Sequence, residues 1–294
     1  MKSIESKIQT LLDDGKEFDH GYIAQAVVLA SIPHSKPKET YFRRQNGDYT
    51  LKMIADPEIG LPYGSIPRLL LAWITTEAVR TKNRELVLGE SLAGFMRQLD
   101  IEPTGGKKGT ITALRQQIKR LFATMISFTY SDNEHDAGVN MLIIDGYDLW
   151  WSPKNINQTG LWKSTMTLNE KFFKEITSRP IVFYTYALKL LRKSPMALDI
   201  YMWLTYKNSY SKNPITIPWE SLQLQFGASY PMTTQGKQDF KRKFTEAIKK
   251  VKAVYPEAKK VEILPEGLRY VPGQPHVPKI KNARSTKNRE HNPH

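Results

Sequence analysis

The chain has 294 residues, and its 43 lysines and arginines outnumber its 29 aspartates and glutamates, which gives a formal net charge of +14. This charge favours a polyanionic partner, either nucleic acid or an anionic membrane surface. There is no cysteine, which excludes disulfides, thiolate metal sites and a cysteine nucleophile, and no apolar run approaches the ~20 residues of a transmembrane helix.

The first 60 residues predict an N-terminal helical and extended segment. Apolar residues recur at helical spacing over residues 3–14, a second apolar run covers residues 22–32, and residues 49–55 alternate as in a strand. Charged residues are scattered through residues 1–18, which is unlike a secretory signal peptide. We therefore expect a cytoplasmic protein with no membrane partner.

Residues 61–151 predict a domain in which a basic helix follows a short helix and a glycine-rich turn. In order, the pattern predicts a helix after Pro67, a strand at 85–88, a short helix at 91–99, a turn at 104–109 and a basic helix at 109–125. Apolar strands at 126–130 and 140–144 then enclose a polar loop. This is the order of a winged helix-turn-helix domain, with the two strands as its wing.

Residues 164–273 predict a second domain that repeats this order after a linker at 152–163. Its predicted elements are a short strand at 166–168, helices at 169–176, at 182–191 and from Pro195, a strand at 215–219, a short helix at 222–226, a basic helix at 235–254, and strands at 261–264 and 268–271. Residues 274–294 are basic and almost free of apolar residues, so we expect a disordered tail. The predicted fold is α+β and helix-rich, with two tandem winged helix-turn-helix domains, each with a small β-hairpin wing.

Each predicted basic helix has an apolar face for the core and a basic face for a partner. Arginine can bind guanine through two hydrogen bonds and glutamine can bind adenine, while lysine and threonine suit phosphates and base edges. The alternative is that both helices are amphipathic helices with merely solvated charges. The candidate DNA-binding residues are Lys107, Lys108, Thr110, Thr112, Arg115, Gln116, Lys119 and Arg120 in the first half, and Lys237, Lys241, Arg242, Thr245 and Lys249 in the second.

No pattern predicts a catalytic residue, a metal ligand set or a cofactor. The six histidines are scattered and form no H-x-H or H-E-x-x-H pair. The turn GGKKGT resembles a phosphate-binding loop in composition only, because G-x-x-x-x-G-K-[ST] is absent. We therefore expect a protein that is not an enzyme.

Several blocks of the sequence resemble the plasmid-encoded RepA family of replication initiators. They are STMTLNEKFFKEITSRPIVFYTYALKLL (164–191), SPMALDIYMWLTYKNS (194–209), ITIPWESLQLQFG (215–227), LPYGSIPRLLLAWITTEAV (61–79) and RELVLGESLAGFMRQLDIEPTGGKKGTITALRQQIKRLF (84–122). The resemblance spans about residues 60–273. The segment RPIVF departs from the more usual proline-aspartate version, and no single block is a catalytic signature.

The resemblance implies a role that spacing alone does not. Such initiators consist of two winged-helix domains and bind double-stranded DNA at directly repeated origin sites, called iterons. They help to melt an adjacent A·T-rich region and recruit host replication initiator and helicase-loading proteins. Many dimerise through the N-terminal domain and repress their own gene, which contributes to plasmid copy control.

Two other classes of function stay open at the level of sequence. A winged-helix transcriptional repressor, for example an autorepressor, would use the same two modules without initiating replication, and it would bind a palindrome rather than direct repeats. An enzyme acting on nucleic acid would need the histidine pair, phosphate loop or carboxylate set that the sequence lacks.

Overall fold

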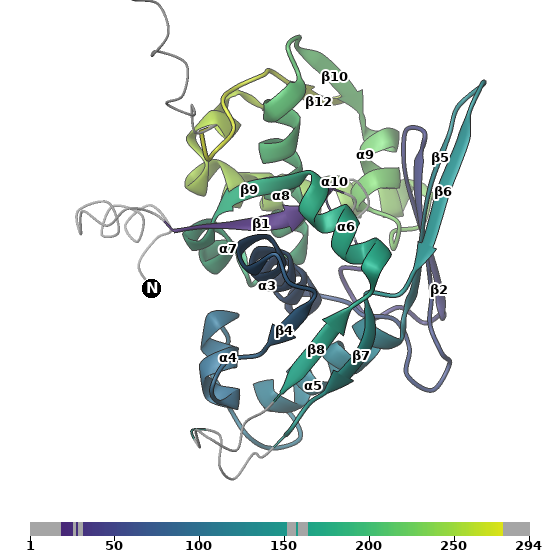
Figure 1. Cartoon of the computed structure of the whole chain (residues 1–294). Coiled ribbons are helices and arrows are strands. Elements are labelled where there is room, and N and C mark those ends of the chain that lie inside the picture. Colours follow the sequence, from purple (N-terminus) through teal and green to yellow (C-terminus); the bar gives the residue numbers. More distant parts are fainter. Residues whose placement is uncertain (1–18, 26–27, 29–31, 152–156, 158–163, 279–294) are drawn as a thin grey trace, which may run out of the picture.

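The structure is a computed structural model, and it describes residues 19–278 except 26–27, 29–31, 152–156 and 158–163. Three predictions fall outside these ranges: the helix at 3–14, the linker apart from Asn157, and the tail beyond residue 278. The described residues form a mixed α+β structure, which confirms the predicted class (Figure 1).

Eight α-helices and twelve strands occur in the described ranges. The helices are α3 Ser65–Thr81, α4 Leu92–Gln98, α5 Thr110–Ala123, α6 Glu170–Ser178, α7 Thr185–Leu191, α8 Pro195–Tyr210, α9 Trp219–Phe226 and α10 Thr234–Val254, with a short 3-10 helix, η1, at Pro256–Lys260. The strands are β1 His20–Ala24, β2 Tyr41–Asn46, β3 Tyr49–Ile54, β4 Glu85–Val87, β5 Met125–Ser131, β6 Asp136–Met141, β7 Ile144–Asp148, β8 Thr165–Leu168, β9 Pro180–Tyr184, β10 Ile215–Pro218, β11 Glu262–Ile263 and β12 Gly267–Tyr270. Both predicted basic helices, α5 and α10, are therefore helical within two residues of the predicted bounds.

The same order of elements occurs twice along the chain. The first module runs α3, β4, α4, α5, β7, β8, and its strands form a sheet in the order β4-β8-β7. The second module runs α8, β10, α9, α10, β11, β12, and its sheet has the order β10-β12-β11. In each module the third strand lies between the first and the second, and the basic helix precedes the last two strands.

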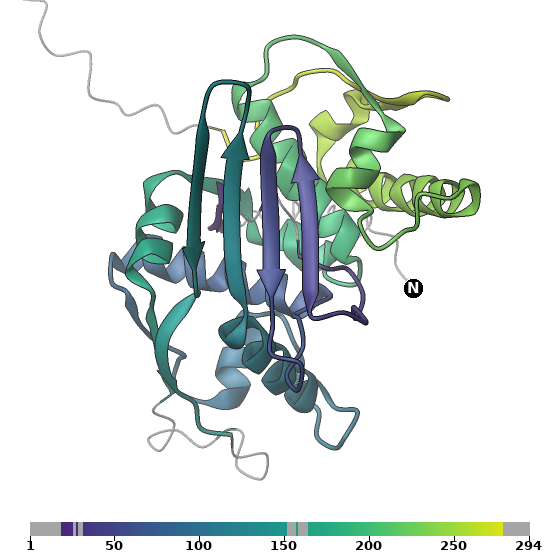
Figure 2. The same cartoon turned by 90° about the vertical axis from the view of Figure 1, so that its right-hand side faces the viewer.

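The hairpin that was predicted as the first wing belongs to another sheet. Strands β5 and β6 join β2 and β3 in a four-stranded antiparallel sheet of order β2-β3-β5-β6, with Tyr49 opposite Tyr130 and Ile54 opposite Met125. Figure 2 shows this sheet face-on. The pairing sets the buried Met53 of β3 opposite the buried Ile126 of β5, so that both strands place apolar residues on the same covered face.

Strand β8, predicted to open the second domain, pairs with β4 and β7 of the first module. Residues 149–164, which include the predicted linker, therefore connect two strands of one sheet. This pairing crosses the predicted domain boundary. Strand β8 is followed in the sequence by helices of the other half, but its backbone hydrogen bonds are satisfied by β4 and β7 on its two sides.

Three further predictions differ from the structure. Residues 180–184 (PIVFY) form β9, paired with β1, instead of the start of a helix, because β-branched and aromatic residues suit a strand with an available partner. Residues 33–47 are polar and interrupted by Pro33 and Pro37, so the sequence predicts no strand there, yet they contain β2. The predicted disordered tail starts too early, since His276 packs among Tyr186, Tyr201 and Tyr255.

The two modules meet at α3 and α8 through a buried group of charges. Arg68 of α3 binds both carboxylate oxygens of Asp199 of α8, each at 2.7 Å, and His34 Nε2 lies 2.6 Å from Asp199 Oδ2. Burial would raise the pKa of Asp199, but the charge and hydrogen bonds of Arg68 and the hydrogen bond from His34 hold it well below its usual range. Burial lowers the pKa of His34 to about 4. This cluster ties the first helices of the two modules together.

Candidate nucleic-acid interface

The turn before α5 is held by two threonines. The Thr104 backbone N–H donates to Thr110 Oγ1 at 2.8 Å, and the Thr110 N–H donates to Thr104 Oγ1 at 2.9 Å. The turn is so tight that a Cβ on Gly109 would lie 2.2 Å from the carbonyl oxygen of Gly105. The Thr112 hydroxyl donates to the carbonyl of Gly106 at 2.9 Å. Thr110 and Thr112, two of the predicted DNA contacts, therefore shape the turn.

Helix α5 buries the apolar face that the sequence predicts. The spacing of Leu114, Ile118, Leu121, Phe122 and Met125 predicts this face. The first three are fully buried and Phe122 nearly so, whereas Met125 lies in β5 and is 50% exposed. The opposite face carries Arg115, Gln116 and Lys119, which are exposed together with Lys107 and Lys108 in the turn. Among the described residues, none of these four cations has an ion-pair partner.

Arg120 lies on the side of α5 that faces residues 60–63. Its Nη1 donates to the carbonyl oxygen of Leu61 at 3.1 Å, and its guanidinium lies 5.5 Å from the centre of the Tyr63 ring. Arg120 thus fastens α5 to the loop before α3. Its guanidinium is therefore already engaged within the protein, and its role in DNA binding stays a prediction.

Helix α10 packs its apolar face against an aromatic cluster of the second module. Phe240 and Phe244 are buried, and their rings contact Trp219 at centroid distances of 6.3 and 5.8 Å. Thr233 caps the helix, since its hydroxyl accepts a hydrogen bond from the Gly236 N–H at 3.2 Å. The predicted core stripe of α10 is confirmed.

Most cations on the exposed face of α10 already have partners. Lys237 Nζ lies 2.8 Å from Glu220, and Arg242 lies 3.3 Å from both Asp239 and Glu246. Lys241 sits over the Trp219 ring at 4.9 Å and donates to the carbonyl of Pro265 at 3.3 Å. Thr245 is half-buried, and Lys249 is exposed without an ion-pair partner in the described ranges.

These partners alter the carboxylates beside α10. The hydrogen bond from Lys237 and its charge lower the pKa of Glu220. The hydrogen bond from Lys243, at 3.0 Å, is the largest cause of the lowered pKa of Glu246. Sequence reasoning missed Glu220 and Lys243, although the three-residue spacing of Lys243 and Glu246 on one helix face was visible.

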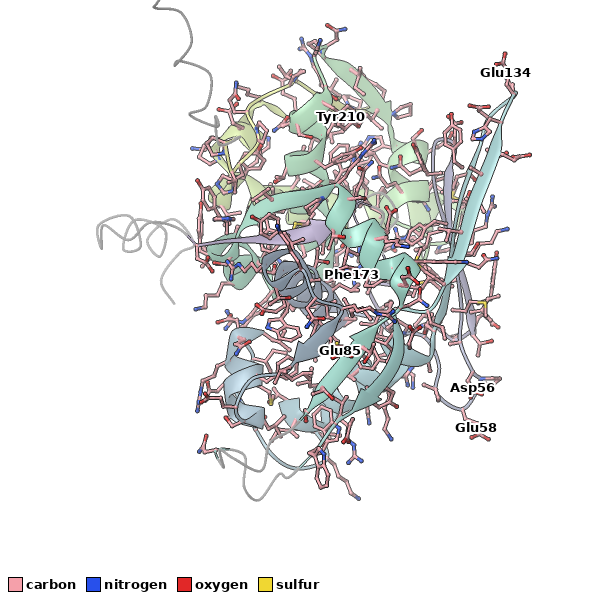
Figure 3. All side chains as sticks on the ribbon, viewed as in Figure 1. Asp56, Glu58, Glu85, Glu134, Phe173 and Tyr210 are labelled. Carbon is pink, nitrogen blue, oxygen red and sulfur yellow. The ribbon has the colours of Figure 1, made fainter. Side chains whose placement is uncertain are left out.

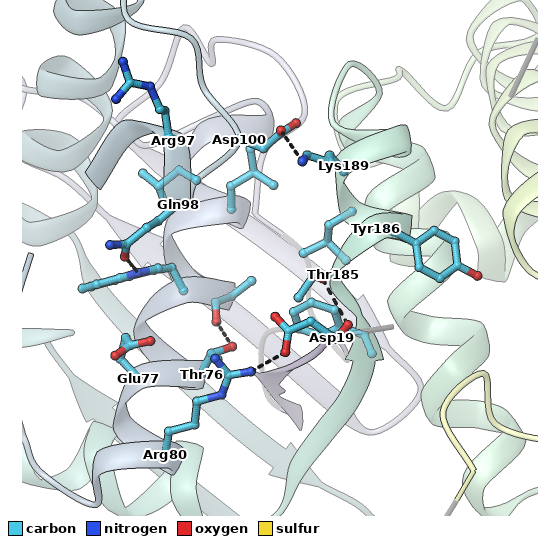
Figure 4. Close-up of a pocket in the computed structure, with 16 residues that line it drawn as sticks. Asp19, Thr76, Glu77, Arg80, Arg97, Gln98, Asp100, Thr185, Tyr186 and Lys189 are labelled. Atoms are coloured by element: carbon cyan, nitrogen blue, oxygen red, sulfur yellow. Dashed lines mark hydrogen bonds and ion pairs between the residues drawn. The ribbon is translucent and has the colours of Figure 1, made fainter. Parts of the chain in front are cut away.

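A cleft of about 570 Å³ lies between α3, α4 and α7, away from both basic helices (Figure 4). Its rim carries both signs of charge, with Arg80 2.8 Å from Asp19 and Lys189 3.3 Å from Asp100. Within the described ranges, no three histidine, cysteine or acidic side chains come together as a metal site requires. None of the described helices has the length and apolar character of a membrane span.

A family model described as plasmid encoded RepA protein matches residues 61–220, which run from the start of the first module into α9. The chain belongs to this family. The match includes α5 and ends before α10, so the RepA family identity rests on the first module and on the beginning of the second.

Other comparisons place this RepA protein beside solved structures. It is similar to the crystal structure of RctB domains 2-3 (RctB-155-483), with a TM-score of 0.49 and 10% identity over 81% of this chain and 83% of that chain. A selenomethionine derivative of domains 2 and 3 of RctB matches with a TM-score of 0.48 and 10% identity over 76% and 82% of the two chains. The comparison with curated proteins finds no match.

Proposed function

We propose that this RepA protein is a plasmid replication initiator that binds directly repeated sites in double-stranded DNA and has no catalytic activity of its own. The observation that carries the proposal is the repeated module: a basic helix follows a short helix and precedes two strands, in the same sheet order, in both halves of a member of this family. The net charge of +14 supplies the attraction to a polyanion.

In this proposal each module is a winged helix-turn-helix, and α5 and α10 enter successive major grooves. The wings are then the strand pairs β7–β8 and β11–β12, not the β5–β6 hairpin. Arg115 and Gln116 are placed to read base edges, while Lys107, Lys108 and Lys119 bind phosphates. On α10, Lys237 and Arg242 bind the backbone or bases once DNA phosphates replace their carboxylate partners, and the exposed Lys249 binds there directly.

The remaining parts of the proposal follow the family. The protein opens an A·T-rich region, recruits host replication initiator and helicase-loading proteins, and forms a homodimer that represses its own gene in the cytoplasm. The second candidate function is a transcriptional repressor without an initiator role. The repeated module supports both, because it concerns DNA binding alone.

Footprinting of the full chain on its parent replicon tests the proposal. Protection of several direct repeats is expected for an initiator, whereas protection of a single palindrome would favour the repressor. The logarithm of affinity against that of salt concentration should slope at roughly −5 to −9 if about 6–10 phosphates are neutralised. A slope near −2 would mean that one module binds alone.

The spacing of the two contacts provides a sharper test. The buried Arg68–Asp199 pair joins the modules, so the two helices cannot turn independently. Inserting five base pairs between the two half-contacts rotates one of them by about half a turn of DNA. Affinity should fall towards that of one module. Unchanged affinity would contradict the arrangement with two DNA-reading helices.

A further inference from the structure

A cavity of about 340 Å³ lies where the turn between β2 and β3 meets α8, α9 and β10. Gln45 to Gly47 line it from the turn, Trp203, Lys207 and Tyr210 from α8, and Gln225 from α9. Figure 3 labels Tyr210 at the end of α8, in the upper part of the molecule. No aspartate or glutamate is among the residues that line this cavity, although it contains a lysine.

Lys207 is a buried cation without a counter-ion. Its side chain belongs to a residue that is 9% exposed, and no carboxylate in the described ranges forms an ion pair with it. Its ammonium lies over the rings of Tyr270, Tyr210 and Trp203 at 4.9, 5.6 and 5.8 Å. Burial lowers its pKa. The aromatic faces attract the charge, but they accept none of its three N–H donors as an oxygen would.

Gln225 also lines the cavity and holds a second donor within its wall. The residue is 5% exposed, and its Nε2 has no hydrogen-bond partner among the described residues. A buried donor without an acceptor destabilises the folded chain. The lining thus contains two buried nitrogen donors and no acidic side chain.

Arg44 of β2 adds to the positive potential beside this cavity. It is 1% exposed, its Nη1 donates to the carbonyl oxygen of Gln225 at 2.6 Å, and its Nε and Nη2 have no hydrogen-bond partner in the part of the chain that the structure describes. The carboxylate whose charge reaches Arg44 is that of Asp199, which Arg68 and His34 already bind. The excess of buried positive charge favours an anion on this side of the second module.

We propose that this cavity binds a small phosphate-bearing ligand, with the Lys207 ammonium as its charged donor. Lysine binds phosphate as a point charge. The volume falls at the lower end of the ~300–1,000 Å³ of small-molecule sites. A duplex backbone cannot reach a residue buried as deeply as Lys207, so the ligand is a free phosphate or nucleotide.

Binding would join three parts of the chain. The ligand would contact the β2–β3 turn, α8 and α9 at once, and so fasten the four-stranded sheet to the second module. The proposal depends neither on DNA binding nor on the assignment of α5 and α10.

Equilibrium dialysis of the full chain with labelled inorganic phosphate, at an ionic strength held constant with sodium chloride, tests the proposal. Saturable binding of one phosphate per chain is expected, with at least ten-fold weaker binding in Lys207→Met. Lys212→Met is the matched control, since it removes an exposed lysine in the loop after α8 and should leave binding unchanged. Uptake that does not saturate, or equal binding by Lys207→Met, would overturn the proposal.

A second variant guards against misfolding of the first. Gln225→Glu keeps the size of the side chain and places a carboxylate beside Lys207, so it should abolish phosphate binding while the chain stays folded by circular dichroism. Retained phosphate binding in this folded variant also overturns the proposal. Competition with AMP then decides the source, since AMP that binds ten-fold tighter than phosphate identifies a nucleotide and AMP that does not compete identifies free phosphate.

Discussion

Helices α5 and α10 occupy equivalent places in the two modules, yet their basic faces differ. The cations of α5 and its turn, Arg115, Lys119, Lys107 and Lys108, are exposed without carboxylate partners among the described residues. On α10, Lys237 and Arg242 are paired with acidic residues, and Lys241 is held over Trp219. Although α10 has more basic residues, only its Lys249 and Lys250 lack a partner in the described ranges, against the four cations of α5 and its turn.

This difference separates the number of charges from their availability. An exposed ion pair contributes only about 0–1 kcal/mol, so DNA phosphates can replace the carboxylates on α10. Replacing a carboxylate by a phosphate on α10 contributes less to the free energy of DNA binding than a new phosphate contact on α5 does, because an existing ion pair is lost. We therefore expect α5 to contribute more to specificity and α10 to contribute more to positioning.

The largest expected effect concerns the link that makes the two helices one unit. Asp199→Asn leaves Arg68 buried without its counter-ion and should lower the free energy of unfolding by about 3–5 kcal/mol. Urea unfolding at neutral pH measures this loss. Asp239→Asn, at an exposed ion pair on α10, is the control and should change stability by less than about 0.5 kcal/mol. A loss below about 1 kcal/mol in Asp199→Asn would show that the modules are held together by other contacts.

A second test concerns the end of α10, which has a cover that α5 lacks. His276 stacks on Tyr255, directly after α10, and burial lowers the pKa of His276 to about 4. Because the pKa of His276 in the folded chain lies below the ordinary 6.5, the neutral, buried ring contributes fully to the free energy of unfolding above pH 6.5. This contribution is lost as the pH falls towards 4, and it amounts to at most about 3 kcal/mol.

Urea unfolding of the native chain and of His276→Gln between pH 7 and 4 measures this contribution. The native chain should lose more stability than the variant over this range, while His34 affects both equally. Parallel pH profiles would mean that His276 is as accessible to protons in the folded state as in the unfolded state.

The third prediction compares the two helices directly. Arg115→Ala should cost about 1–3 kcal/mol of affinity on the cognate site and relax base preference at one position. Arg242→Ala should cost less than about 1 kcal/mol, since its ion pairs with Asp239 and Glu246 are also removed. Fluorescence anisotropy at one fixed salt concentration measures both. Equal losses would remove the proposed distinction between α5 and α10.

The smallest effect is expected from releasing charges on α10. Glu246→Gln frees Lys243 and leaves Arg242 paired with Asp239 alone, and it should tighten DNA binding by a factor of roughly two to five, which is about 0.4–1 kcal/mol. Glu134→Gln is the matched control, since it makes the same change of charge at the tip of the β5–β6 hairpin (Figure 3). If both variants tighten binding equally, net charge rather than release of the paired cations explains the gain.

Local sequence by itself determined the two basic helices and the strands of the second module. The faces of α5 and α10 follow from the spacing of their own apolar residues, so helices at 109–125 and 235–254 were predicted, within two residues of the observed bounds. Strands β10, β11 and β12 were predictable because prolines, glycines and short apolar runs mark their ends. The basic composition and the family blocks likewise depend on no contact between distant residues.

Only the tertiary structure decided which distant segments pair and which cations are available. The alternation of apolar residues in β5 and β8 predicts strands but not their partners. In the structure β5 pairs with β3 and β8 pairs with β4, although segments nearer in the sequence offer the same backbone hydrogen bonds. Arg120 and Lys241 are residue types that commonly contact DNA. In the structure, however, Arg120 is bound to the carbonyl group of Leu61 and Lys241 lies over the ring of Trp219. Nothing in the sequence distinguishes Lys207 from the other lysines on helices. Only the folded structure buries its side chain and leaves it, among the described residues, without a carboxylate as ion-pair partner. Each of these outcomes depends on residues far apart in sequence, where local periodicity carries no information.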